Sequence, residues 1–138
     1  MKTMKLLPIR LSPGADLRAA LEAAIHEHGV DSAFVLSGIG SLVDAQLRFA
    51  NEAAETQISG PLELVSISGT LTSSGSHLHV AVADRHGAVT GGHLGYGSLI
   101  RTTAEILLAP LADWVLAREQ DGQTGFKELV IRTRCAKK

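Results

Sequence analysis

SHLHVAVADRHGAVTGGH, the sequence of residues 76–93, predicts a β-hairpin. We expect one strand over Ser76–Ala83 and a second over Ala88–His93. The residues between them include the three-residue loop Arg85-His86-Gly87. Its Gly87 suits the left-handed position that ends a type I turn with a G1 bulge. The composition of the loop therefore selects one turn geometry.

The turn fixes which histidines face one another. A three-residue loop pairs Asp84 with Ala88, and counting outward from that pair places His79 opposite His93. A two-residue loop would pair His79 with Gly92 and turn His93 to the other face. A metal site that includes all three histidines therefore requires the register in which His79 is paired with His93.

His77, His79 and His93 form the candidate metal site. In a strand, His77 and His79 point to the same face with Cα atoms about 6.5 to 7 Å apart, a separation that two imidazoles can close onto one ion. Three imidazoles with an open fourth position suit a divalent transition metal, zinc first and iron or nickel as alternatives, and leave room for water, an anion or a substrate. The alternative is a solvated strand face with a histidine in the turn. His86 is expected to point away at the surface.

Two carboxylates are candidate catalytic residues. Glu63 begins a predicted strand on the same face as Ile67, so its carboxylate is expected to be partly buried and to need a partner. Glu105 shares a face with Leu107. Either could be a fourth ligand, a hydrogen-bond acceptor for a ligand, or a general base. The alternative for each is an exposed strand edge or a subunit interface.

The remainder of the chain predicts one helix among many strands. Apolar residues recur with helical spacing over Leu17–His28, where Asp16 can cap the start and Gly29 the end. We expect a turn at Gly38-Ile39-Gly40-Ser41, and the segment Ala112–Gln120 suits either a helix or a strand. Further strands are expected at Lys5–Arg10, Ser32–Ile39, Val43–Ala50, Leu62–Leu71, Thr102–Ala109 and Lys127–Arg134. This order argues for a single α+β domain over residues 1–138, with a largely antiparallel, barrel-like sheet and one amphipathic helix packed on it.

Composition narrows the function classes. A net charge of -1 gives no overall attraction to nucleic acid or anionic membrane. The single cysteine, Cys135, cannot form an internal disulfide and fits a reducing cytoplasm. We find no export signal, and the longest apolar run, Ile106–Ala112, is far shorter than a membrane helix. We therefore expect a soluble cytoplasmic protein with no membrane partner.

Five segments together resemble one family. Gly60-Pro61-Leu62-Glu63-Leu64-Val65-Ser66 looks like the Gly-Arg-Phe-Glu-Ile-Leu-Ser segment of the PPC domain, which is conserved in plants and prokaryotes. Ser76-His77-Leu78-His79 with Gly91-Gly92-His93-Leu94 looks like its central signature. Arg118-Glu119-Gln120-Asp121 and Thr124–Leu129 are similar to the end of bacterial members.

The resemblance implies a PPC-domain fold that assembles as a homotrimer, with the histidines near the subunit boundaries. It also implies a distant kinship to acetolactate decarboxylase, whose zinc is held by three histidines from a similar hairpin. Metal ligation is carried over to His77, His79 and His93, and a supporting role to Glu63. Two departures stand out: the Arg-Gly-Arg-Pro hook of the plant proteins is missing, and Pro61 replaces the family's arginine.

Three functions follow from these observations. The first is a trimeric metal-binding module for a small ligand or for regulation. The second is a DNA-binding protein like the plant relatives, which the charge and the missing hook oppose. The third is a metal-dependent lyase or hydrolase that uses Glu63 or Glu105.

Overall fold

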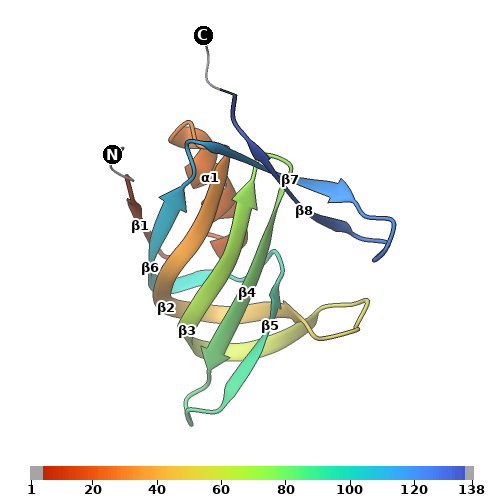
Figure 1. The fold of residues 1–138 in the computed structure, drawn as a ribbon. Coiled ribbons are helices and arrows are strands. Elements are labelled where there is room, and N and C mark those ends of the chain that lie inside the picture. Colours follow the sequence, from red (N-terminus) through yellow and green to blue (C-terminus); the bar gives the residue numbers. More distant parts are fainter. Residues whose placement is uncertain (1–4, 136–138) are drawn as a thin grey trace.

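A computed structural model describes residues 5–135, which form eight strands and one helix (Figure 1). In chain order the elements are β1 (Leu7–Leu11), α1 (Leu17–Glu27), β2 (Ser32–Arg48), β3 (Thr56–Thr72), β4 (Gly75–Ala83), β5 (Val89–Leu94), β6 (Ile100–Pro110), β7 (Trp114–Gln120) and β8 (Lys127–Thr133). Helical structure in this part of the chain is confined to α1, and no helix here is long and apolar enough to cross a bilayer.

Six strands form one curled antiparallel sheet in the order β1-β6-β2-β3-β4-β5. The curl is closed because the far end of β2 also pairs with β5, through Leu47 with Leu94 and Arg48 with His93. The long strands β2 and β3 make this possible by bending across the bottom of the molecule (Figure 1). The expectation of an α+β domain with a largely antiparallel, barrel-like sheet is confirmed.

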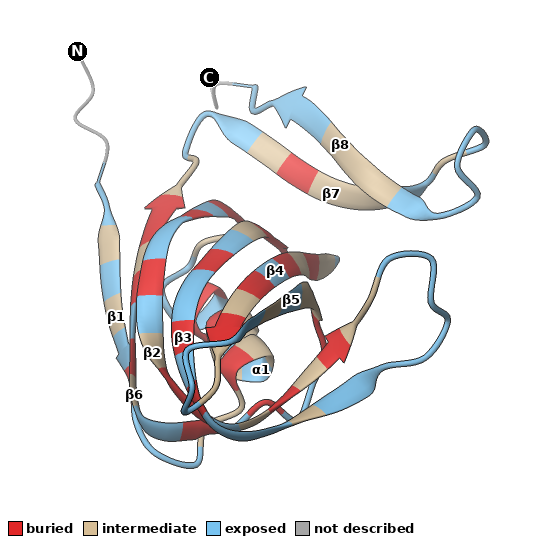
Figure 2. Cartoon of the chain, turned by 90° about the horizontal axis from the view of Figure 1, so that it is seen from below, coloured by how far each residue is buried: buried red, intermediate tan, exposed pale blue. Residues whose placement is uncertain are grey.

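Helix α1 fills the concave side of the curled sheet (Figure 2). Asp16 caps its start by accepting a hydrogen bond from the Ala19 N–H at 3.1 Å, as expected. Its apolar stripe is buried in the core, where Leu17 and Leu21 are fully inaccessible to solvent. The helix ends at Glu27 and Gly29 follows at φ 66°, a left-handed conformation that favours glycine.

The predicted turn at Gly38-Ile39-Gly40-Ser41 is wrong, because β2 runs through it without a break. The two glycines serve close packing instead. A Cβ atom at Gly38 would overlap Ile67 and Ile106, and one at Gly40 would lie 2.8 Å from the Ala104 Cα. Gly38 and Gly40, which suggested a turn, therefore mark a place where neighbouring strands approach closely.

Strands β7 and β8 form a separate two-stranded ribbon, here called the arm, which extends beside the barrel (Figure 2). The segment that suited either a helix or a strand is thus a strand, β7. Ser32 Oγ accepts a hydrogen bond from the Leu116 N–H at 2.8 Å, and Asp31 forms an ion pair with Arg134 at 2.6 Å. These contacts fix the base of the arm to the barrel.

Candidate metal centre

The β4–β5 hairpin has the register that the turn predicted. The Asp84 N–H donates to the Ala88 carbonyl at 3.0 Å, and Gly87 has φ 79° in the loop. His79 is paired with His93 across the two strands. His86 lies exposed in the loop, as expected.

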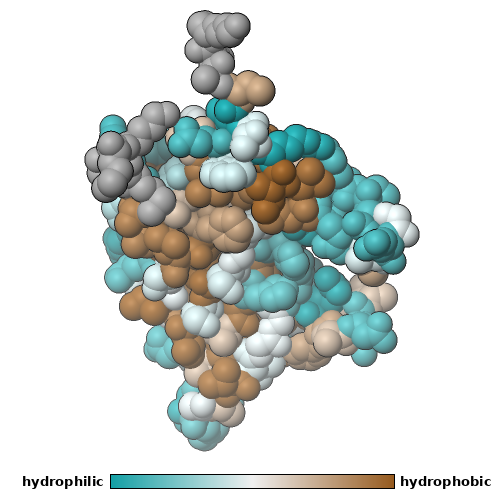
Figure 3. All heavy atoms as spheres, viewed as in Figure 1, coloured by the Kyte–Doolittle hydropathy of each residue, from teal (hydrophilic) through white to brown (hydrophobic). Residues whose placement is uncertain are grey.

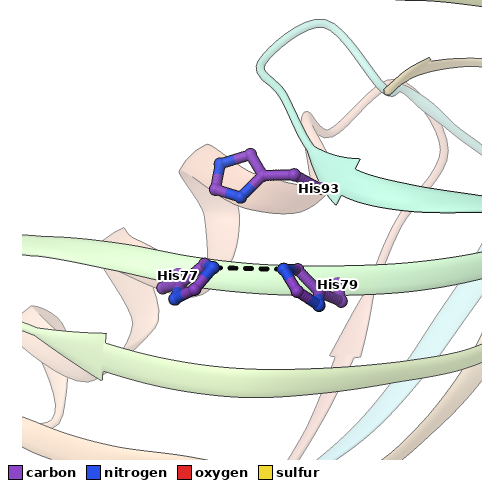
Figure 4. A group of neighbouring side chains, drawn as sticks. All are labelled: His77, His79 and His93. Carbon is purple, nitrogen blue, oxygen red and sulfur yellow. Dashed lines mark hydrogen bonds between the residues drawn. The ribbon is translucent and has the colours of Figure 1, made fainter. Parts of the chain in front are cut away.

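The three histidine rings converge on one point (Figure 4). His77 and His79 project from β4 with their Nε2 atoms 3.1 Å apart, and the ring of His93 faces them from β5. One nitrogen from each ring lies within 4.8 Å of the others. In a tetrahedral zinc site, bonds of about 2.0 to 2.1 Å place neighbouring nitrogens about 3.3 Å apart. Ring rotations that bring the nitrogens closer by up to about 1.5 Å would therefore satisfy a metal ion.

Burial and charge keep two of these rings neutral at pH 7. Burial lowers the pKa of His93 to about 4, and the nearby Arg48 adds to the effect. Burial also lowers the pKa of His77, with the positive charge of Arg118 next in importance. Nδ1 of His93 is buried and has no hydrogen-bond partner among the described residues. A neutral imidazole with an unused ring nitrogen is the form that binds a metal.

Arg18 of α1 holds the two histidine-bearing strands where their pairing stops. The β4–β5 ladder ends at His79–His93, so His77 lies beyond the last pair. The Arg18 guanidinium donates to the carbonyl of Ser76 at 3.4 Å and to that of Leu94 at 3.2 Å. It thereby bridges the residue before His77 and the residue after His93.

Gly69 of β3 supports His77 from the other side. It is paired with Leu78 and has φ 138°, a conformation that side chains rarely adopt. A Cβ atom here would overlap the His77 carbonyl oxygen and lie 2.9 Å from the Leu78 Cα. The close approach of β3 to β4 at His77 therefore requires a glycine.

The two candidate carboxylates lie away from the histidines. Glu63 is exposed, and the expectation of a partly buried carboxylate is wrong because a β-bulge between Leu64 and Ser66 moves Ile67 to the opposite face. Glu63 is paired with Ala83, four residues or about 13 Å along β4 from His79.

Glu105 is exposed on β6. Strands β2 and β3 separate β6 from β4 in the sheet, so three strand spacings, about 14 Å, lie between Glu105 and the histidine strand. Among the described residues, the cluster with metal-ligand geometry consists of the three histidines alone.

The structure adds Arg118 to the site, a residue that sequence reasoning did not assign to it. The arm brings the guanidinium Nη2 to 3.4 Å from Nδ1 of His77. The alternation of Trp114, Leu116 and Arg118 was visible in the sequence, but it does not reveal that the arm folds back over β4. Arg118, Glu128 and the two histidines of β4 line a hollow of about 200 Å³.

Comparison with known proteins places the chain in a family. The model of the Plants and Prokaryotes Conserved (PCC) domain, the family abbreviated PPC above, matches residues 1–112. A curated relative, the "Bifunctional protein GlmU" of Synechococcus sp. (strain JA-2-3B'a(2-13)), is 43% identical over 130 residues, which are 94% of this chain. The chain spans about a fifth of the length of the curated relatives that it matches, 21% in each case.

Three solved structures share the fold. A hypothetical protein from Salmonella is 34% identical with a TM-score of 0.93, covering 98% of both chains. The metal-containing protein AF0104 from Archaeoglobus fulgidus is 28% identical with a TM-score of 0.78, covering 94% of this chain and 99% of its own. A protein of Bacteroides thetaiotaomicron, described as a "putative dna binding protein", is 20% identical with a TM-score of 0.82 over 94% of both chains, and shows the fold alone. The chain belongs to the Plants and Prokaryotes Conserved (PCC) domain family.

Proposed function

We propose that this protein is a cytoplasmic, homotrimeric PCC-domain module that binds a divalent transition metal through His77, His79 and His93. The convergence of three ring nitrogens within 4.8 Å, on two strands in the required register, carries the proposal. Three nitrogen ligands suit zinc first, with iron or nickel as alternatives. A fourth coordination position would remain open, which fits a module that binds a small ligand or regulates a partner.

The relative from Archaeoglobus fulgidus supports this proposal, because it is described as metal-containing and resembles this chain over nearly the whole length of both. The protonation state of the ligands also fits, because the rings of His77 and His93 are neutral at pH 7. A divalent ion could therefore bind these two histidines without displacing a proton from either.

Metal content of protein made without a histidine tag tests the proposal. We expect about one zinc equivalent per chain in the wild type by elemental analysis, since a single site is proposed. His77→Ala should lose most of the bound zinc, because only two of the three histidine ligands remain. His86→Ala is the matched control, since His86 belongs to the same hairpin but lies exposed in its loop. Near-zero metal in all three proteins, even after refolding with zinc, would contradict the proposal.

The exposed apolar surface of the sheet supports the trimer. On its outer face, Leu36 and Ile39 of β2 are 51% and 55% exposed and Val65 of β3 is 48% exposed. Figure 3 shows apolar side chains gathered over the strands at the front of the molecule. A surface of this kind is typical of subunit interfaces. Light scattering should give three times the chain mass for the wild type and a smaller mass for Ile39→Lys. A wild-type monomer would contradict this arrangement.

DNA is the second candidate partner, suggested by the description of the Bacteroides relative. Two arginines of the C-terminal region are already engaged, Arg132 by Glu119 at 2.8 Å and Arg134 by Asp31 at 2.6 Å. We therefore expect no gel shift with duplex DNA at low salt. A shift that weakens steeply with added salt would favour DNA binding instead.

A lyase or hydrolase function would need a general base near the ion. Glu63 and Glu105 do not supply it within one chain, since about 13 Å of strand and about 14 Å of sheet separate them from the histidine strand. A catalytic function would therefore have to use Glu128, which lines the hollow and accepts a hydrogen bond from the Thr124 hydroxyl at 3.1 Å. Because three histidines carry the metal proposal without any such base, we place binding ahead of catalysis.

A further inference from the structure

The hollow beside the histidines has two walls of different origin. The barrel supplies Thr70, His77 and His79, and the arm supplies Arg118 and Glu128. Its volume is about 200 Å³. Pockets for drug-sized ligands are larger, about 300 to 1,000 Å³. A ligand that fits here has only a few non-hydrogen atoms.

Cationic side chains surround the histidine cluster. Arg118 lies 3.4 Å from the His77 ring, and Arg48 is paired with His93 across β2 and β5. Within residues 5–135, neither arginine forms an ion pair with a carboxylate. Arg18 differs, because Glu22 neutralises it at 3.3 Å. Arg118 and Arg48 are thus set against one carboxylate, Glu128, and the site has excess positive charge before any metal binds.

The side chain of Arg118 is only partly engaged. Its Nη2 atom donates to the Lys127 carbonyl at 2.9 Å, which anchors the side chain within the arm. This bond and the contact with His77 both use Nη2. The Nε and Nη1 atoms make no hydrogen bond within the described part of the chain, and their N–H groups remain able to donate. A guanidinium fork binds a carboxylate or phosphate through two parallel hydrogen bonds.

We propose that Arg118 and the metal together bind a small oxyanion, either the carboxylate or the phosphate group of a compact molecule, at the open coordination position. The inference rests on the proposed metal centre. One anion oxygen would occupy the fourth metal position and another would accept from Arg118. The negative charge of the anion would offset part of the positive charge of the ion and the guanidinium, and Glu128 would disfavour additional negative charge at the rim.

The experiment uses Co²⁺ in place of zinc, because its visible absorption reports a change in the coordination shell. Acetate, oxalate and phosphate are titrated separately into the Co²⁺-loaded wild type, with sodium perchlorate to hold ionic strength. The three titrations distinguish carboxylate from phosphate recognition. Thermal shift with the same anions on metal-free protein measures binding that does not need the metal.

Three variants separate the role of Arg118 in binding from its role in the arm. Arg118→Ala removes the fork, and Arg118→Lys keeps the charge without it. Arg132→Ala is the matched control, since Arg132 is also on the arm but pairs with Glu119. We expect anion affinity to fall about tenfold to a hundredfold in Arg118→Ala, less in Arg118→Lys, and not in Arg132→Ala. Circular dichroism and Co²⁺ affinity establish that each variant is folded and loaded.

The outcomes also separate the two proposals. A wild type that takes up no Co²⁺ would overturn the metal centre and this inference together. Normal Co²⁺ uptake with the same anion affinity in wild type and Arg118→Ala would overturn this inference alone. Equal anion binding with and without metal would also overturn it, because the ion would then play no part in recognition.

Discussion

Replacement of Gly69 by alanine should weaken the metal centre without touching a ligand. The new Cβ atom would overlap the His77 carbonyl oxygen and lie 2.9 Å from the Leu78 Cα, whereas ordinary contacts begin at 3.4 Å. Strand β4 must therefore move by at least about 0.5 Å at Leu78 and by more at His77. The displacement shifts the His77 ring relative to His79 and His93.

The energetic cost has two parts. A non-glycine residue at such a φ costs about 1 to 3 kcal/mol, and overpacking costs about another 1 to 3 kcal/mol. The sum, about 2 to 6 kcal/mol, is a large fraction of the stability of an ordinary domain. For a chain of this length, about 3 °C of Tm is lost per kcal/mol, so we expect a decrease of about 6 to 18 °C.

Gly87→Ala is the matched control for Gly69→Ala. Gly87 has φ 79° in the same hairpin, but a Cβ atom there meets nothing within 4 Å. Its alanine variant should show the backbone cost alone, about 1 to 2 kcal/mol, with unchanged metal affinity. Calorimetry and zinc titration of both variants measure the difference. We expect zinc affinity to fall about tenfold or more in Gly69→Ala. Equal Tm and equal zinc affinity in the two variants would refute the reasoning.

Three further predictions concern the helix cap, the arm and the ion. Asp16→Ala should lose about 1 to 2 kcal/mol in urea denaturation, since the carboxylate caps α1 and accepts from the Gly97 N–H at 2.6 Å; unchanged stability would contradict this. The hydrogen bond from Arg134 holds the pKa of Asp31 below its usual 3.8, so this ion pair stabilises the fold above that pH and the benefit is lost as pH falls through the folded value. The Tm difference between wild type and Asp31→Asn should therefore be present at pH 7 and shrink below about pH 4, and a pH-independent difference would be evidence against the pair. Free zinc at a hundred times its Kd should stabilise the wild type by about 2.7 kcal/mol, and chelation should remove this gain; His93→Ala should show a much smaller gain, and an equal one would argue against the site.

The hairpin was predictable because its information is local. A three-residue loop with glycine in its last position sets the pairing, and the alternation of a strand sets the face, so His79 had to lie opposite His93. The helix was predictable for the same reason, from its apolar spacing and from Asp16 at its start. No tertiary contact was needed for either.

The errors arose where distant strands meet. Gly38 and Gly40 were interpreted as a turn because glycine is common in turns, but their role depends on Ile67, Ile106 and Ala104, which are far away in the sequence. The expected burial of Glu63 was wrong because of a β-bulge. One extra residue in β3 makes the residues after the bulge face the opposite side of the sheet from the one predicted. Arg118 reaches His77 across 41 positions of sequence, and no local pattern encodes that contact.

The arm has a consequence for how this protein could diversify. The family model ends at residue 112, before β7 begins at Trp114, yet the wall that faces the histidines includes Arg118 and Glu128. The three proposed metal ligands thus lie within the segment that the family model matches, whereas Arg118 and Glu128, which would determine the preferred anion, lie after it. Exchange of residues 113–138 between relatives should alter ligand preference while the ion and its affinity stay the same.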